Sequence, residues 1–142
     1  MISKTYSNAN LQAFSGGIND LGSTATTVKC ALLDSGYTPN QDTNADWSTI
    51  SANEITASGY SAGGAEITTK SLTLTGNTVT FDGDNVQWTS TATITARYAV
   101  VYEVTSSYLL CYHDFEADES ATNGTFTVQW NSSGIFQVSA ST

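Results

Sequence analysis

The sequence predicts an all-β protein, a single-domain β-sandwich or small barrel with a short N-terminal helix. Three observations lead to this prediction. Apolar residues alternate with polar ones in about seven short runs, turn residues separate these runs roughly every 8 to 12 residues, and only 12% of the 142 residues are charged. Alternation with a period of two is typical of strands with one buried face. A chain of this length can bury a complete core.

Residues 1–25 are predicted to form an N-terminal helix and arm, and residues 26–142 the β-sandwich core. In "NANLQAF" Leu11 and Phe14 share one helical face, and the "SGG" that follows ends the helix. The first strand of the core lies in "TTVKCALL", where apolar residues on both faces indicate burial on both sides.

Two short segments follow this strand. "WSTISANE" predicts one or two helical turns, with Asp46 as the N-cap. "GYSAGG" predicts turns that need positive φ angles. It lacks the lysine and the strand-to-helix context of a phosphate-binding loop.

The second half of the chain predicts consecutive hairpins. "SLTLTGNTVTF" folds back at Gly76-Asn77, a two-residue loop. "ATITARYAVVYEV" is the longest alternating run and predicts a central strand. Asn123-Gly124 is expected to introduce the strand "TFTVQW", and "GIFQVS" is the last strand. The residues expected on one face of the central strand are Ala92, Ile94, Ala96, Tyr98, Val100, Tyr102 and Val104, with Thr93, Thr95, Arg97 and Glu103 on the other.

The charge balance excludes several classes of partner. Four basic and thirteen acidic residues give a net charge of −9 without a basic stripe. Nucleic acid and anionic membrane surfaces both attract clustered lysine and arginine, so neither is an expected partner. The N-terminal segment has no apolar run of a signal peptide, which predicts synthesis and retention in the cytoplasm of the producing cell.

The chain offers little for catalysis. Its one histidine, His113, is expected to be a strand residue satisfied by a backbone partner, because no nucleophile-elbow motif accompanies it. Cys30 and Cys111 lie in apolar strand sequence and are expected to be buried thiols, although a disulfide stays possible if their strands are neighbours. Their spacing fits no zinc motif. We therefore predict that the protein is not an enzyme.

Carboxylates are the one chemically suggestive group. Asp82, Asp84 and Asn85 in "DGDN" offer oxygen ligands of the kind Ca²⁺ prefers, although the loop lacks the glutamate of an EF-hand. The alternative interpretation is a solvated hairpin turn. "DFEADE" concentrates four more acids, and a pair of carboxylates could in principle hydrolyse a glycosidic bond. No cofactor is expected other than this candidate Ca²⁺.

The loop "YTPNQDTNADW" contains the single proline of the chain. Proline fixes the local backbone, and Asn and Asp side chains can bond to it. We therefore expect an ordered loop, fixed by Tyr37 and Trp47, whose polar residues contact another protein. The candidate interface residues are Tyr37, Pro39, Asn40, Gln41, Asp42, Trp47 and, in the glycine-rich loop, Tyr60.

Three long segments resemble a widespread family of small virion proteins of tailed bacteriophages: "VKCALLDSGYTPNQDTNADWSTISANEITASGYSAGGAEI", "VTFDGDNVQWTSTATITARYAVVYEV" and "NGTFTVQWNSSGIFQVSA". The resemblance covers about residues 26–140. Its most specific pieces are "ALLDSGYTPNQDT", "ITARYAVVY" and "GTFTVQW". It implies an all-β, often oligomeric component of the virion without assigned chemistry, made in the cytoplasm of the host bacterium.

The leading hypothesis from this resemblance is a capsid decoration or cement protein. Its expected partners are further copies of itself, in a homo-oligomer such as a trimer, and the major capsid protein or other virion proteins. A tail or neck protein is the alternative within the same class. A third hypothesis is a surface-displayed module that binds glycans through exposed Tyr and Trp. Strand parity places Trp88, Tyr98, Tyr102 and Trp130 in the core instead.

Overall fold

The computed structural model describes residues 1–141, with Ser90 described by its backbone alone. The strands are β1 (Ile2–Thr5), β2 (Val28–Leu33), β3 (Ala65–Glu66), β4 (Ser71–Thr75), β5 (Thr78–Asp82), β6 (Val86–Glu103), β7 (Leu109–Val128) and β8 (Phe136–Ser139). One α-helix, α1 (Ser7–Ser15), and two 3₁₀ turns, η1 (Trp47–Thr49) and η2 (Ser51–Asn53), complete the described elements. None of the described helices is long and apolar enough to cross a membrane.

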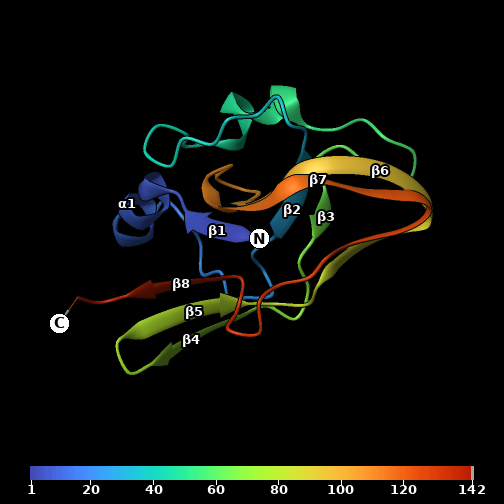
Figure 1. Cartoon of the computed structure of the whole chain (residues 1–142). Coiled ribbons are helices and arrows are strands. Elements are labelled where there is room, and N and C mark those ends of the chain that lie inside the picture. Colours follow the sequence, from blue (N-terminus) through green and yellow to red (C-terminus); the bar gives the residue numbers. More distant parts are fainter. Residues whose placement is uncertain (142) are drawn as a thin grey trace.

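The strands form two antiparallel sheets, which confirms the predicted all-β, sandwich-like fold. The five-stranded sheet has the order β1-β7-β6-β2-β3, and the three-stranded sheet has the order β4-β5-β8. Figure 1 shows the smaller sheet below the larger one, with α1 at one side. A core of buried side chains fills the space between the sheets, with Cys30 from the larger sheet, Phe81 from the smaller one and Ile135 from the segment before β8.

A long, curved hairpin of β6 and β7 joins the two layers (Figure 1). Its turn end pairs with β1 and β2, and its open end bends toward the three-stranded sheet. The register shifts between Trp88 and Ala92, between Ala92 and Ile94, and between Ala96 and Tyr98. Each such bulge bends and twists a strand, so the bulges allow one hairpin to follow both layers.

The bulge between Ala96 and Tyr98 also changes the face of the sheet toward which the side chains of β6 point. Ala96 faces the core between the sheets, whereas Tyr98 and Tyr102 face a second buried cluster on the other side of the five-stranded sheet. The prediction of one continuous apolar face from Ala92 to Val104 is therefore wrong. At this irregularity β6 advances two residues, from Ala96 to Tyr98, while its partner β7 spans five, from Asp114 to Glu119, and the side chains of β6 beyond it lie on the opposite faces.

Several predicted elements are confirmed. Helix α1 ends at Gly16, which has the left-handed backbone (φ +78°) of a helix C-cap. The β4–β5 hairpin turns at Gly76 (φ +61°) and Asn77 as a two-residue loop. Strand β2 is buried on both faces. In α1, however, Leu11 and Phe14 remain exposed, and Ala9 is the buried residue.

Two predictions about strand boundaries are wrong. Residues 1–25 do not form only a helix and arm, because Ile2–Thr5 pair with Cys111–Asp114 as an edge of the five-stranded sheet. The strand predicted to begin after Asn123-Gly124 is continuous with the acidic segment before it, and both belong to one strand, β7 (Leu109–Val128). Asn123 (φ +50°) is the extra residue of a bulge within it and does not introduce a new strand.

Glu103, predicted on the polar face of β6, is fully buried at the β6–β7 turn. Its carboxylate accepts hydrogen bonds from Ser106 N (2.8 Å), the Ser106 hydroxyl and Asn19 Nδ2 (3.1 Å). Burial alone would raise the pKa of Glu103, but these hydrogen bonds outweigh it and hold the pKa below its ordinary value. The carboxylate thus stays charged and ties the turn to the segment after α1.

Gly64 is the glycine whose replacement should be most costly. It has φ +78°, and a Cβ atom there would lie 2.0 Å from the carbonyl oxygen of Cys30 in the neighbouring β2. We expect Gly64→Ala to lower the free energy of unfolding by about 3 kcal/mol or more. Gly76→Ala is the matched control, since it has a positive φ but open space around the Cβ position, and should cost about 1 kcal/mol. Urea denaturation measures both, and equal losses would contradict the steric argument.

Candidate functional site

The loop between β2 and η1, residues 37–47, covers the outer face of the five-stranded sheet, and Tyr37 fixes its first end. The Tyr37 ring is buried edge-on against Tyr98, with 5.4 Å between ring centroids. Its hydroxyl donates to Asn44 Oδ1 (2.9 Å) and lies 2.7 Å from the Tyr6 hydroxyl, which must then be the donor in that pair. Burial raises the pKa of Tyr37 to about 12, so the phenol keeps the proton it donates.

Trp47 fixes the other end of the loop. Its indole stacks on Tyr102 with 4.8 Å between ring centroids and 5° between ring planes. Its backbone N–H donates to Ser107 O (2.8 Å), and Leu109 N donates to Ala45 O (3.0 Å), so the loop end is hydrogen-bonded to the β6–β7 turn. The expectation that Tyr37 and Trp47 attach this loop to the domain is confirmed.

Two asparagines order the loop between these ends. Asn40 Oδ1 accepts from the backbone N–H groups of Asp42 and Thr43, both at 3.1 Å. Asn44 Oδ1 accepts from Asn40 N (2.9 Å) in addition to the Tyr37 hydroxyl. These are the side-chain turns expected for Asn in a loop. The loop is therefore held in one conformation without contacts from outside the chain.

The loop also supports the start of α1. The residue at the helix N-cap, Tyr6, has no side-chain capping bond. Gln41 O accepts instead from Ser7 N (3.0 Å), and the Ser7 hydroxyl donates to Asp42 Oδ1 (2.7 Å). A free N–H at a helix start needs a partner, and a loop distant in the sequence supplies it. Loop and helix therefore position each other.

The remaining interface candidates take different positions. Pro39 is half-buried, while Asn40 and Asp42 are exposed and Gln41 is partly so. Tyr60 packs against Trp88, and its hydroxyl donates to Glu54 Oε1 (2.7 Å) and accepts from Leu32 N. The ring of Tyr60 is thus engaged within the domain.

The prediction for Asp46 is half right. It lies at the N-cap position of η1, but its carboxylate accepts from the Ser48 hydroxyl and makes no capping bond to a backbone N–H. The predicted helical turns are present as η1 and η2. The backbone carbonyl of Asp46 accepts from Thr49 N and the Thr49 hydroxyl instead.

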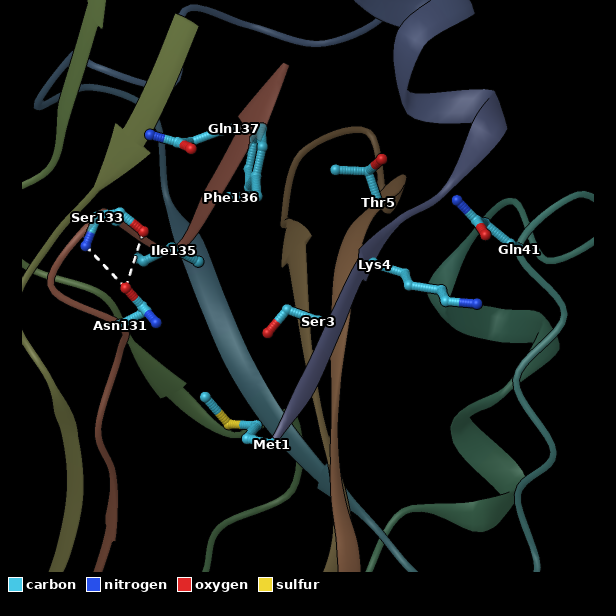
Figure 2. A pocket seen from close by; sticks show the side chains of 11 residues that line it. Met1, Ser3, Lys4, Thr5, Gln41, Asn131, Ser133, Ile135, Phe136 and Gln137 are labelled. Atoms are coloured by element: carbon cyan, nitrogen blue, oxygen red, sulfur yellow. Dashed lines mark hydrogen bonds between the residues drawn. The ribbon is translucent and has the colours of Figure 1, made fainter. Parts of the chain in front are cut away.

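A cleft of about 540 Å³ opens beside this loop, between the outer edges of β1 and β8. Figure 2 shows β1 on one side of the cleft, the 131–137 segment on the other, and Gln41 of the loop at its margin. Its lining residues are Met1, Ser3, Lys4, Thr5, Gln41, Asn131, Ser133, Gly134, Ile135, Phe136 and Gln137. None of them is acidic, in a protein with a net charge of −9.

His113 lies directly behind the β1 wall of this cleft, opposite Ser3 in the β1–β7 register. Ser3 Oγ is 2.5 Å from His113 Nδ1, and Cys111 Sγ is 3.6 Å from His113 Nε2. The ring nitrogens of His113 therefore bond to two side chains and not to the backbone partner that the sequence predicts. Burial lowers the pKa of His113 to about 4, so its ring is neutral near pH 7.

The Ca²⁺ candidates serve as hydrogen-bond acceptors in the β5–β6 connection. Asp82 Oδ1 accepts from Gly83 N, Asp84 Oδ2 accepts from the hydroxyls of Thr68 and Thr69, and Asn85 Oδ1 accepts from Trp130 N. The three oxygens therefore accept hydrogen bonds from three separate segments of the chain, at residues 83, 68–69 and 130. Among the residues described, no group of three or more His, Cys, Asp or Glu side chains gathers as a metal site.

Cys30 and Cys111 are both buried free thiols. Val101 of β6 is the register partner of both, so the cysteines lie two strands apart. Neighbouring strands are about 4.8 Å apart, which places the two backbones roughly 10 Å from each other. A disulfide needs less than about 7 Å between Cα atoms, so these two cysteines do not pair in this fold.

No protein family model, no curated protein and no solved structure matches this chain.

The residues of β1 are the part of this region that sequence reasoning missed. The segment "ISKTY" is short and polar and precedes a helix signal, so its sequence predicts part of the N-terminal arm. The available signal is its alternation: Ile2 and Lys4 lie at one parity, and Ser3 and Thr5 at the other. A strand of four residues with one apolar side chain carries too weak a pattern to predict alone.

Replacement of Asn44 by Ala should loosen the loop. The change removes the acceptor for Tyr37 Oη and Asn40 N, at a cost of about 1–2 kcal/mol. Hydrogen exchange of the backbone amides of residues 40–46 should become faster, while β6 and β7 keep their protection. Thr43→Ala is the control, because no hydrogen bond is found for that exposed side chain. Equal exchange in both variants would contradict the role given to Asn44.

Titration of His113 should make the free energy of unfolding depend on pH. Its pKa is about 4 in the folded protein and about 6.5 when unfolded, so the unfolded chain binds more protons between these values. Stability should therefore fall as the pH drops through this range, by about 3 kcal/mol in all. Urea unfolding at pH 7 and pH 5 measures the slope. His113→Gln should flatten it, and an unchanged slope would assign the dependence to other groups.

Proposed function

We propose that this chain is a structural component of a tailed-phage virion, a capsid decoration or cement protein that binds the outer capsid lattice as a homo-oligomer. The resemblance of its three long segments to small virion proteins supports the assignment to a phage particle. The observation that supports a structural, contact-making role is the ordered polar loop, residues 37–47, with its two aromatic fixings.

The order of this loop favours docking. Its backbone is held by Asn40 and Asn44 before any partner arrives, while Asp42 and Thr43 remain exposed. Association costs free energy for each side chain or loop that must be ordered. A preordered loop avoids most of that cost, so a lattice of many small contacts can be stable.

The charge distribution supports the same function. Glu116, Asp118 and Glu119 are exposed on β7, and the net charge is −9. Such a surface repels free copies in solution and is attracted to a capsid surface with positive potential. The proposed protein would therefore remain dispersed until it meets the assembled lattice.

The alternatives differ in the support they receive. A tail or neck location would use the same loop, and mass spectrometry of separated heads and tails distinguishes it from the capsid. A glycan-binding module would stack sugars on exposed rings. Trp47 and Tyr60 instead stack on Tyr102 and Trp88 within the domain, and Tyr37 is buried. The rings of these loops thus give the glycan hypothesis no support.

A bulky substitution in the loop of residues 37–47 should weaken binding to capsids. Thr43→Arg places a long cation on the exposed loop without removing any side-chain hydrogen bond found in the structure. We expect binding to purified, expanded capsids to weaken by about tenfold or more, which corresponds to about 1.4 kcal/mol. Thr73→Arg, the same change at an exposed position of β4, is the matched control and should bind like the wild type.

Co-sedimentation of the protein with capsids, and the heat resistance of the capsids, measure this binding. The wild-type protein should bind stoichiometrically and raise the temperature at which capsids lose their DNA. Binding to tails alone would move the protein to the tail, and failure to bind either structure would refute the proposal.

A further inference from the structure

The cleft between β1 and β8 is bordered by two strand edges with unpaired backbone groups. Among the strands that the structure describes, β1 pairs only with β7, and β8 pairs only with β5. Exposed edges of this kind are templates for an additional strand.

On β1, the backbone groups of Ser3 and Thr5 point into the cleft. Tyr6 N donates to Leu110 O at 3.0 Å, in line with the β1–β7 register, so Tyr6 belongs to a hydrogen-bonded pair. Hydrogen-bonded pairs alternate with non-hydrogen-bonded pairs along an antiparallel ladder. Lys4 and Ile2 therefore also belong to hydrogen-bonded pairs with β7. Ser3 and Thr5 therefore direct their N–H and C=O groups away from β7. No backbone bond to them is found elsewhere among the described residues.

On β8, the backbone groups of Gln137 and Ser139 point away from the β5–β8 ladder. Ala140 N donates to Asn77 O at 2.8 Å, in register with the β5–β8 pairing, so Val138 belongs to the hydrogen-bonded set. Gln137 and Ser139 then direct their backbone groups away from β5. Gln137 lines the cleft, so free backbone groups border the cleft on both sides.

The size of the cleft suits a short strand. A residue in a sheet takes roughly 3.4 Å along the strand, 4.8 Å between strands and 10 Å between layers, or about 160 Å³. The cleft of about 540 Å³ therefore has room for three or four residues. That number matches the four residues of β1 itself.

The two sides of β1 determine what the added strand must carry. Ser3 and Thr5 face the space between the sheets, where Ile135 and Phe136 line the opposite wall, while Lys4 points to the other side toward Gln41 (Figure 2). The only salt bridges found are Met1–Glu116 and Arg97–Asp114, so Lys4 has no acidic partner among the residues that the structure describes. Opposite charges on neighbouring strands stabilise a pair.

We propose that the cleft binds an extended segment of a partner protein, with the alternating pattern apolar–acidic–apolar, as an additional strand on β1. The segment bonds to the free groups of Ser3 and Thr5, places its carboxylate beside Lys4, and packs its apolar side chains toward Ile135 and Phe136. The inference rests on the proposed function in one respect: the partner is a protein of the same particle.

A peptide titration tests the cleft without any phage particle. The probe is the peptide acetyl-Thr-Val-Asp-Val-Thr-amide, and the control is the same peptide with Lys in place of Asp. We expect the amide resonances of Ser3 and Thr5 to shift and to become protected from hydrogen exchange at millimolar peptide. The acidic peptide should bind about five- to tenfold more tightly than the basic one. No response at either amide, or equal affinities, would overturn the proposal.

Proline substitution tests the orientation of the backbone. Thr5→Pro removes an N–H group that points into the cleft, while the β1–β7 hydrogen bonds stay intact. Binding of the acidic peptide should therefore weaken about tenfold. Thr5→Ala keeps the N–H and should bind like the wild type. Lys4→Glu should abolish the preference for the acidic peptide, whereas Lys70→Glu, the same charge change elsewhere, should preserve it. Circular dichroism confirms that each variant is folded.

Two outcomes separate this proposal from others. Protection of Ser3 and Thr5 that grows with protein concentration in the absence of peptide would show that a second copy occupies the cleft, and would overturn the assignment to a partner. A wild-type protein that binds the peptide but no capsid or tail refutes the proposed function alone. If the wild-type protein, Thr5→Pro and Lys4→Glu all bind capsids equally well, the proposed role of the cleft is refuted and the proposed function is not.

Discussion

The fold depends on the pairing of β6 with β7, the longest ladder in the molecule. One end of this hairpin provides two adjacent inner strands of the five-stranded sheet, and the other end bends toward the three-stranded sheet. Such a path requires a change of direction, which the bulges near Ala92 and Ala96 provide. Because the same bulge turns Tyr98 and Tyr102 to the outer face, it also creates the second buried cluster. The loop of residues 37–47 is attached to that cluster, so the candidate contact surface depends on the hairpin as well.

Sequence reasoning was reliable where a local pattern determines the structure. The hairpin at Gly76-Asn77, the end of α1 at Gly16, and the burial of β2 on both faces follow from turn chemistry and alternation. The attachment of the polar loop by Tyr37 and Trp47 also followed from its composition. Sequence reasoning was unreliable where irregular pairing between two strands decides which side chains are buried. Neither the bulge between Ala96 and Tyr98 nor the one at Asn123 has a local signal strong enough to distinguish it from regular strand or turn.

Long-range pairing explains the other errors. Glu103 reads as an exposed charge in an alternating strand, and only the fold brings Asn19 and Ser106 to its carboxylate. The edges of β1 and β8 are separated by more than a hundred residues in the sequence, so their cleft exists only once both sheets have formed. Edge positions cannot be read from alternation, because alternation reports which face is buried and not which neighbour is missing. The loop could therefore be predicted from the sequence, whereas the cleft beside it could not.

The free edges of the cleft carry a risk as well as a capacity to bind. Unpaired strand edges promote association between copies, and proteins limit this with short edges and lysines. Here both edges are four residues long, and Lys4 lies in the middle of β1. Two β1 edges brought together would place two lysines close to each other, on subunits that already repel through their net charge. A strand with a carboxylate at the matching position meets no such repulsion. The feature that discourages copies from pairing is therefore the same one that selects an acidic strand.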